Sequence, residues 1–245
     1  MSTVRARYRN GMIEYYDSTT HQILDVVASV KFRDDFLGYQ PLLSETGSRG
    51  PWLTVEVALN TAIALKAATL NGVLELVFDA DVNAEDAVLY FGDQLAFNLK
   101  ALASIQFRAA IGVLPTLTSQ IVMGLASAHD LAKDSVTVNA WFKLDGDGAV
   151  VCESDDTGVD NDDKASGVTV VAGVYHNYRI DFGNLADVRF FIDGVHVAAG
   201  TTFDMSTLTD AEALVQPYFS IDKDADAGLG SVLLDSVLLW SQAAA

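Results

Sequence analysis

The segment VYHNYRIDFGNLADVRFFIDGVHVA, residues 174–198, decides the fold class. Apolar residues alternate with other residues over 178–182 and again over 188–192, and Asp193-Gly194 separates the second run from Val195 and Val197. Alternation with this spacing, punctuated by Asp-Gly, is typical of β-strands joined by tight turns. The segment therefore predicts three consecutive antiparallel strands with one buried face.

The same pattern extends through the rest of the chain and predicts about a dozen strands in one antiparallel β-sandwich. Residues 52–70 are rich in alanine and leucine, but their alternation favours strands over a helix. Residues 154–166 are predicted to form an exposed polar loop. Residues 206–214 are predicted to form a short helix, because Thr209 and Glu212 have the spacing of a capping box.

The composition excludes some classes of partner. The chain has 245 residues and a net charge of −18, from 33 acidic and 15 basic residues. Phosphate backbones would repel such a chain, so we expect no nucleic-acid partner. Residues 109–129 carry no charge, but Pro115 and polar neighbours interrupt them, so no membrane span is expected. Cys152 is the single cysteine and is predicted to be a buried structural thiol.

The N-terminal segment differs from the remainder. Val4, Ala6 and Tyr8 alternate with arginines, and Asn10-Gly11 predicts a hairpin turn before a second strand. Residues 1–33 carry a net charge of +2, from five bases and three acids, and the remainder carries −20. We therefore predict a β-arm over residues 1–31 and a sandwich domain over residues 32–245. The alternative is an ordinary edge hairpin of the sandwich.

Several short motifs, in their order along the chain, resemble the concanavalin A-like lectin/glucanase sandwich in its laminin-G-like variety, over residues 32–242. They are Asp34-Asp35-Phe36, Phe107-Arg108, Met123-Gly124-Leu125, Tyr175-His176-x-Tyr178-Arg179-Ile180-Asp181, Phe190-Phe191-Ile192-Asp193-Gly194 and Leu234-Asp235-x-Val237. The resemblance implies an all-β jelly roll.

An Arg-x-Arg-Tyr-x-Asn-Gly hairpin ahead of such a domain resembles tailed-bacteriophage virion proteins. This resemblance implies a capsid cement or decoration protein, made in the host cytoplasm, that binds the major capsid protein on the outside of the shell and stabilises it. Closed symmetry is usual for homo-oligomers, and a trimer is expected. The alternative is a glycan-binding, lectin-like module of a phage tail fibre or adhesin.

Catalytic patterns are absent from the sequence. Retaining glucanases of this fold carry Glu-x-Asp-x-x-Glu on one strand, and the nearest carboxylate spacing here, Glu75 to Asp79, lacks the third acid. No Gly-x-Ser-x-Gly and no zinc-type His/Cys cluster occurs. The sequence therefore predicts a protein that is not an enzyme.

Calcium is the one cofactor that the sequence leaves open. Asp222, Asp224 and Asp226 resemble the start of an Asp-x-Asp-x-Asp loop, but Ala227 and Leu233 stand where an EF-hand needs glycine and glutamate. A second set of acids has no recognised spacing; it consists of Asp155, Asp156, Asp160, Asp162 and Asp163. Solvated acidic loops are the preferred interpretation of both sets, and no cofactor is expected.

The arm is the predicted docking element. Strand alternation places Arg5, Arg7 and Arg9 on one face, where they can pair with carboxylates of the partner. Its tyrosines are predicted to be buried against that partner; they are Tyr8, Tyr15 and Tyr16. A chain beginning near Lys31 is then expected to fold with little loss of stability but to fail to bind particles.

Overall fold

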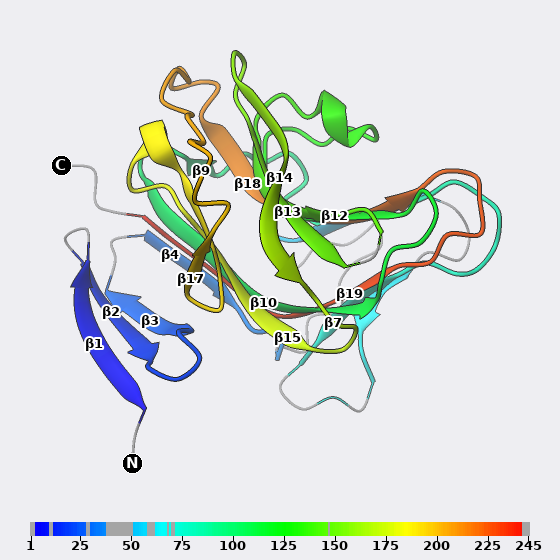
Figure 1. Cartoon of the computed structure of the whole chain (residues 1–245), viewed down its shortest axis with the longest axis horizontal. Helices are drawn as coiled ribbons and strands as arrows, with labels where there is room; N and C mark the ends of the chain where they lie inside the picture. The colour runs from blue at the N-terminus through cyan, green and yellow to red at the C-terminus, as the bar shows by residue number, and fades with distance from the viewer. Residues whose placement is uncertain are drawn as a thin grey trace.

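Two eight-stranded antiparallel sheets face each other across the core, and a three-stranded sheet lies outside one of them (Figure 1). The computed structural model describes residues 3–9, 12–27, 30–37, 51–57, 62–67, 69, 72–146 and 148–241. The predicted all-β sandwich is confirmed. The Asn10-Gly11 turn lies outside the described residues.

The first large sheet, here called the β10 sheet, has the order β17-β16-β15-β10-β19-β7-β6, and β4 also pairs with β19. Its strands are β4 (Val30–Asp34), β6 (Ala62–Leu65), β7 (Leu74–Val77), β10 (Leu102–Val113), β15 (Tyr175–Asp181), β16 (Arg189–Ile192), β17 (Val195–Val197) and β19 (Ser231–Ser241). The three strands predicted within residues 174–198 are β15, β16 and β17. They pair consecutively and antiparallel, as the alternation requires.

The second large sheet, here called the β11 sheet, has the order β14-β13-β12-β11-β18-β8-β5, and β9 also pairs with β18. Its strands are β5 (Leu53–Val57), β8 (Glu85–Tyr90), β9 (Phe97–Asn98), β11 (Gln120–Ala126), β12 (Asn139–Leu144), β13 (Ala149–Asp155), β14 (Asp160–Thr169) and β18 (Leu214–Lys223). Strands β5 and β6 confirm that residues 52–70 contain strands.

The uncharged stretch 109–129 contains the end of β10 and the whole of β11, which belong to opposite sheets. The chain crosses between the layers around Pro115. Among the described residues, no helix is long and apolar enough to span a membrane.

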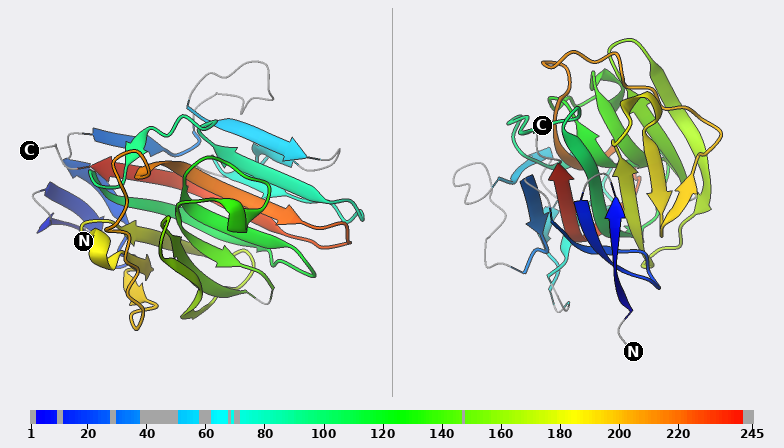
Figure 2. Two further views of the ribbon diagram at one scale, coloured as in Figure 1. Left: turned by 90° about the horizontal axis from the view of Figure 1, so that it is seen from above. Right: turned by 90° about the vertical axis from the view of Figure 1, so that its left-hand side faces the viewer.

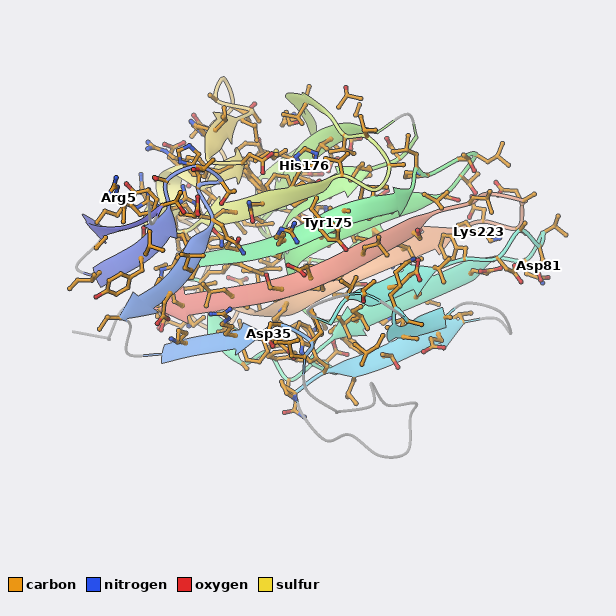
Figure 3. All side chains as sticks on the ribbon, turned by 90° about the horizontal axis from the view of Figure 1, so that it is seen from below. Arg5, Asp35, Asp81, Tyr175, His176 and Lys223 are labelled. Carbon is orange, nitrogen blue, oxygen red and sulfur yellow. The ribbon has the colours of Figure 1, made fainter. Side chains whose placement is uncertain are left out.

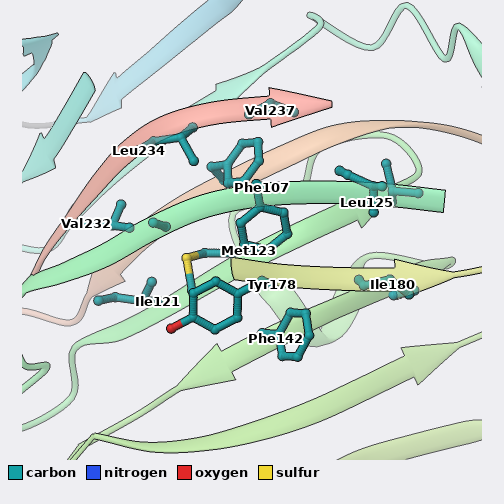
Figure 4. Close-up of a cluster of buried hydrophobic side chains, with 14 of the residues drawn as sticks. Phe107, Ile121, Met123, Leu125, Phe142, Tyr178, Ile180, Val232, Leu234 and Val237 are labelled. Atoms are coloured by element: carbon teal, nitrogen blue, oxygen red, sulfur yellow. The ribbon is translucent and has the colours of Figure 1, made fainter. Parts of the chain in front are cut away.

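Aromatic side chains from both sheets fill the space between them (Figure 4). Phe107 of β10 stacks on Tyr178 of β15 at 5.3 Å between ring centroids, and it meets Phe219 of β18 edge-on at 5.2 Å. All three are almost fully buried. Burial of one such side chain contributes about 1.5–3 kcal/mol, so this contact between layers is a major source of stability.

Two local predictions are wrong. Residues 154–166 are not a loop, because β13 continues to Asp155 and β14 begins at Asp160. Strand β14 is an edge strand, and polar residues on both faces are usual there, which hides its strand character in the sequence. Residues 206–213 form turns rather than a helix, although the Thr209–Glu212 reciprocal hydrogen bonds of a capping box are present.

The N-terminal arm is a sheet of β1 (Val4–Arg9), β2 (Met12–Asp17) and β3 (Ile23–Val27). Ile23 and Val26 pack against Trp240 on the outside of the β10 sheet. The Gln106 side chain accepts a hydrogen bond from Ile23 N at 3.1 Å and donates one to Ile23 O at 3.2 Å. Figure 2 shows the arm at the end of the sandwich where β19 finishes. The domain boundary near residue 31 remains a prediction.

Candidate functional site

The outer face of the β11 sheet carries a row of large side chains that runs across four strands. Trp141 of β12 has two neighbours in the row: Glu153 of β13 on one side and Gly124 of β11 on the other. Beyond Gly124 the row ends with Tyr218 of β18. A Cβ atom at Gly124 would come within 2.7 Å of the Trp141 Cα. Glycine at this position therefore leaves room for Trp141 on the neighbouring strand.

Residues 127–138 fold over one half of this face. Val136 packs with Trp141 and Tyr218, and both aromatic side chains are fully buried. The His129 ring stacks on Tyr218, and its Nδ1 lies 2.7 Å from the Tyr218 hydroxyl. Trp141 lies under this loop and not in the core between the sheets, because its strand position alternates away from that core.

A charged network fixes the 127–138 loop to the sheet. Lys133, at the start of the short 3₁₀ helix Lys133–Ser135, places Nζ 3.3 Å from Asp86 Oδ1 and 3.9 Å from Asp222 Oδ1. Burial raises the pKa of Asp222 to about 7, against the lowering effect of Lys133. Burial also lowers the pKa of His129, although Asp86 opposes this shift. The Asp222 carboxyl group, which contacts the loop through Lys133, therefore titrates near neutral pH.

The other half of the face, over β12 to β14, is more open and acidic. Lys143 of β12 lies 3.0 Å from Asp163 and 3.8 Å from Glu153. Glu153 is only 3% exposed. Burial raises its pKa to about 7, Lys143 opposes the shift, and Asp162 and Asp163 add to it. One lysine therefore only partly compensates the buried carboxyl group.

A β-bulge brings the acids of β14 close to Glu153. Cys152 pairs with Lys164 and Ser154 pairs with Asn161, so two residues of β14, Asp162 and Asp163, lie opposite the single residue between them on β13. Asp163 adopts the left-handed region, with a φ of 49°. Bulges of this type re-aim side chains and are frequent next to functional sites.

Asp155 extends the acidic group along β13. It lies directly opposite Asp160 of β14. Burial, Asp160 and other neighbouring acids raise the pKa of Asp155 to about 6. A hydrogen bond with Asp160 raises the pKa of Asp162. Like charges directly opposite each other destabilise a sheet, so the arrangement costs stability without a bound cation or proton.

Sequence reasoning missed Glu153 and Asp155 as a pair. The strand was predicted to end at Glu153, and Asp155 was assigned to a loop. Strand alternation over residues 152–155 would have indicated the pair. Cys152 and Ser154 point inward, so Glu153 and Asp155 both point to the outer face.

The arm residues are placed as follows. Arg5 is exposed, and Arg7 forms a 2.6 Å ion pair with Glu14 and lies over the Tyr16 ring. The Tyr8 and Arg9 side chains are outside the described set, although both residues belong to β1. Tyr15 points away from the sandwich and is 40% exposed.

The tyrosines therefore do not all share a face. Tyr15 and Tyr16 are consecutive residues of one strand, so their side chains point in opposite directions. Ile23 and Val26 pack on the sandwich, and Glu14 and Tyr16 pair with β3 beside them. The role of the arm in docking remains a prediction.

The three calcium candidates are not brought together. Asp222 lies on the outer face beside Lys133, whereas Asp226 accepts hydrogen bonds from Thr118 and Gly228. Among the described residues, the acids that do gather three ligand oxygens within 4.8 Å are Asp79, Asp81 and Glu85.

The Asp79–Asp81–Glu85 group already has a cation. Lys223 Nζ lies 3.2 Å from Glu85 Oε1 and donates to the backbone carbonyls of Asp79 and Asp81 at 3.1 and 2.8 Å. Lys223 and Asp81 lie at one end of the molecule, with Arg5 of the arm at the other (Figure 3). The Lys223 ammonium therefore lies next to one of the three carboxylates, that of Glu85, and next to the backbone of the other two residues.

Solved structures resemble this fold, but no family model and no curated protein matches the sequence. A protein of unknown function from Shewanella oneidensis MR-1 aligns with a TM-score of 0.57 and 11% identity, over 85% of this chain and 84% of that one. The Emp47p carbohydrate recognition domain aligns with a TM-score of 0.52 and 11% identity, over 83% and 94% of the two chains.

Family 7 alginate lyase A1-II′ aligns with a TM-score of 0.50 and 14% identity, over 75% of this chain and 82% of that one. Likeness at these identities establishes the fold alone, which is the concanavalin A-like sandwich. Proteins of this fold among the neighbours include both carbohydrate recognition domains and an alginate lyase.

The prediction that the protein is not an enzyme is therefore corrected. It was based on the missing Glu-x-Asp-x-x-Glu pattern, but the alginate lyase has the same fold and is an enzyme. The fold serves both lectins and enzymes, so the lack of one catalytic motif does not separate the two classes.

Proposed function

We propose that this protein binds carbohydrate on the outer face of the β11 sheet. The observation that carries the proposal is the buried Asn139 beside Glu153 and Trp141, because its side-chain oxygen has no hydrogen-bond partner among the described residues. This atom is Asn139 Oδ1, and the residue is only 2% exposed. Ligand sites typically combine aromatic walls with a few placed polar groups, and buried polar atoms without partners are rare in folded proteins.

The sugar would approach over β12 to β14. Tyr218 and Trp141 are fully buried, with the 127–138 loop packed against them, whereas Asp155 and Asp163 are accessible to solvent. The carbohydrate recognition domains among the neighbours support this class of ligand.

A glycan microarray probed with the full chain tests the proposal. We expect retention on one class of glycan and at least a tenfold loss of signal in Asp155→Ala, because this residue lies opposite Asn139 and two residues from Glu153, at the open end of the face. Asp224→Ala removes an exposed carboxylate from the loop after β18 and should bind like the wild type. Retention of no glycan, or equal binding by Asp155→Ala, would overturn the proposal.

A second candidate is attachment to a phage capsid as a decoration protein, on the virion surface. The observation that favours it is the outward face of the arm, where Ile13, Tyr15 and Val27 are 40%, 40% and 61% exposed. Exposed apolar residues grouped on one face are typical of interaction surfaces. The alternative to a decoration protein is a glycan-binding, lectin-like module of a phage tail fibre or adhesin, which would agree with the carbohydrate-binding proposal.

Co-sedimentation with capsid shells tests the second candidate. The double variant Ile13→Ser/Tyr15→Ser should lose binding to shells, and Val195→Ser, which alters an exposed apolar residue of β17, should retain it. Sedimentation of the free protein checks the expected trimer. Shells that never co-sediment with the wild type would remove this candidate and leave carbohydrate binding in place.

A further inference from the structure

We propose that the β13–β14 end of the outer face binds the ammonium group of an amine-bearing sugar. This inference rests on the proposed carbohydrate-binding function and names the class of sugar. Its structural basis is a group of acids around the Asp162–Asp163 bulge together with buried acceptor atoms that face it.

The charge balance of this end is strongly negative. Five carboxyl groups gather there, and Lys143 forms ion pairs with two of them, Glu153 and Asp163. The five acids are Glu153, Asp155, Asp160, Asp162 and Asp163. In the part of the chain that the structure describes, no lysine or arginine forms an ion pair with Asp155, Asp160 or Asp162. An anionic sugar would be repelled, and a cationic group would be attracted over the Debye length of about 8 Å.

Asn139 provides an observation that is independent of the charges. It is 2% exposed, lies directly opposite Asp155, and its Oδ1 has no hydrogen-bond partner among the described residues. Glu153 beside it is 3% exposed, with Trp141 as its hydrogen-bonding neighbour and the Lys143 ammonium 3.8 Å away. A buried acceptor without a donor costs about 1–3 kcal/mol, and an ammonium group offers three donors.

The spacing of the acids favours a sugar over a bare metal ion. Calcium needs several oxygens, each 2.3–2.6 Å from the ion. The described acids that bring three such oxygens within 4.8 Å are those beside Lys223, not those of β13 and β14. A sugar ring spreads one ammonium and several hydroxyl donors over its width, and it can satisfy acceptors that stand further apart.

The raised pKa values of Glu153, Asp155 and Asp162 agree with this reading. Burial is the largest cause for Glu153 and Asp155, and a hydrogen bond with Asp160 is the largest for Asp162. In all three, neighbouring acids add to the shift. The site therefore has an excess of negative charge, and a positively charged ligand can compensate it.

Isothermal titration calorimetry of the full chain at pH 6 tests the inference with two probes that differ in charge. Chitosan tetraose carries free amines, and chitin tetraose has the same chain with every amine acetylated. We expect at least tenfold tighter binding of chitosan tetraose and loss of that preference in Asp155→Asn/Asp162→Asn. Asp224→Asn is the matched control and should keep the preference.

The outcomes separate this inference from the proposed function. Equal affinity for both tetramers, unchanged in the double variant, would overturn the amine site and leave carbohydrate binding intact. Binding of calcium chloride that depends on Asp155, without binding of chitosan tetraose, would also overturn it in favour of a metal site. If neither tetramer binds and the glycan microarray is blank, the proposed function itself fails.

Discussion

Replacement of Glu153 by glutamine should stabilise the protein at neutral and alkaline pH. Burial raises the pKa of this carboxyl group from an ordinary 4.5 to about 7. The folded state therefore holds the proton to a higher pH than the unfolded chain. The stability from this group is complete below pH 4.5 and is lost as the pH rises to about 7. The interval corresponds to about 3 kcal/mol at about 1.4 kcal/mol per pH unit.

Glutamine keeps the shape of the protonated acid and does not ionise. Urea unfolding of Glu153→Gln from pH 4.5 to 8.5 should match the wild type at the acidic end and exceed its free energy of unfolding by about 3 kcal/mol at the alkaline end. Part of the pH dependence will remain, because the pKa values of Asp222 and Asp155 are also raised, to about 7 and about 6. The control is Asp224→Asn. A pH profile parallel to that of the wild type would refute a buried, poorly compensated Glu153.

Four further outcomes are expected. Gly124→Ala should lower stability by about 3 kcal/mol in thermal unfolding and alter the near-ultraviolet dichroism of the tryptophans, because a Cβ there meets the Trp141 backbone. Lys223→Met should cost about 3–5 kcal/mol in urea unfolding because it removes the buried ammonium 3.2 Å from Glu85, whereas Lys100→Met on the exposed surface should change nothing measurable. Cys152, whose thiol pKa burial raises to about 12, should react with a thiol reagent only on unfolding. Gln106→Ala should cost about 2 kcal/mol in urea unfolding, because it removes both hydrogen bonds to Ile23.

The sandwich was predictable because its central strands follow simple alternation. Tyr178, Ile180 and Phe190 all point into the core, as the period of two requires, and an Asp-Gly turn follows β16. This pattern depends only on which residues are hydrophobic, so it can be read directly from the sequence. Strand β14 was not predictable in this way, because most of its side chains are exposed or half-buried on both faces, so hydrophobicity does not alternate along it.

The candidate site could not be assembled from the sequence because it depends on contacts between distant segments. The bulge that places Asp162 and Asp163 opposite Glu153 has no signature among the many acids of that stretch. The covering of Trp141 by residues 127–138 likewise follows from tertiary packing.

The arm illustrates the same limit. Its strands and turns were predicted, but not its packing against the sandwich. Trp240 is 1% exposed because Ile23 and Val26 of β3 pack on it. Removal of residues 1–29 would expose this tryptophan, so the structure leads us to expect a substantial loss of stability, in contrast to the expectation from the sequence.

Hydrogen exchange with and without oligosaccharide tests most directly whether the outer face of the β11 sheet binds carbohydrate. The measurement compares peptides from the arm, residues 4–27, with peptides that cover β12 to β14, residues 139–146 and 151–163, in saturating chitosan tetraose or chitin tetraose. Binding on this face should slow exchange in the β12–β14 peptides and leave the arm unchanged. Protection confined to the arm, or absent from β12 to β14 while calorimetry records binding, would contradict it.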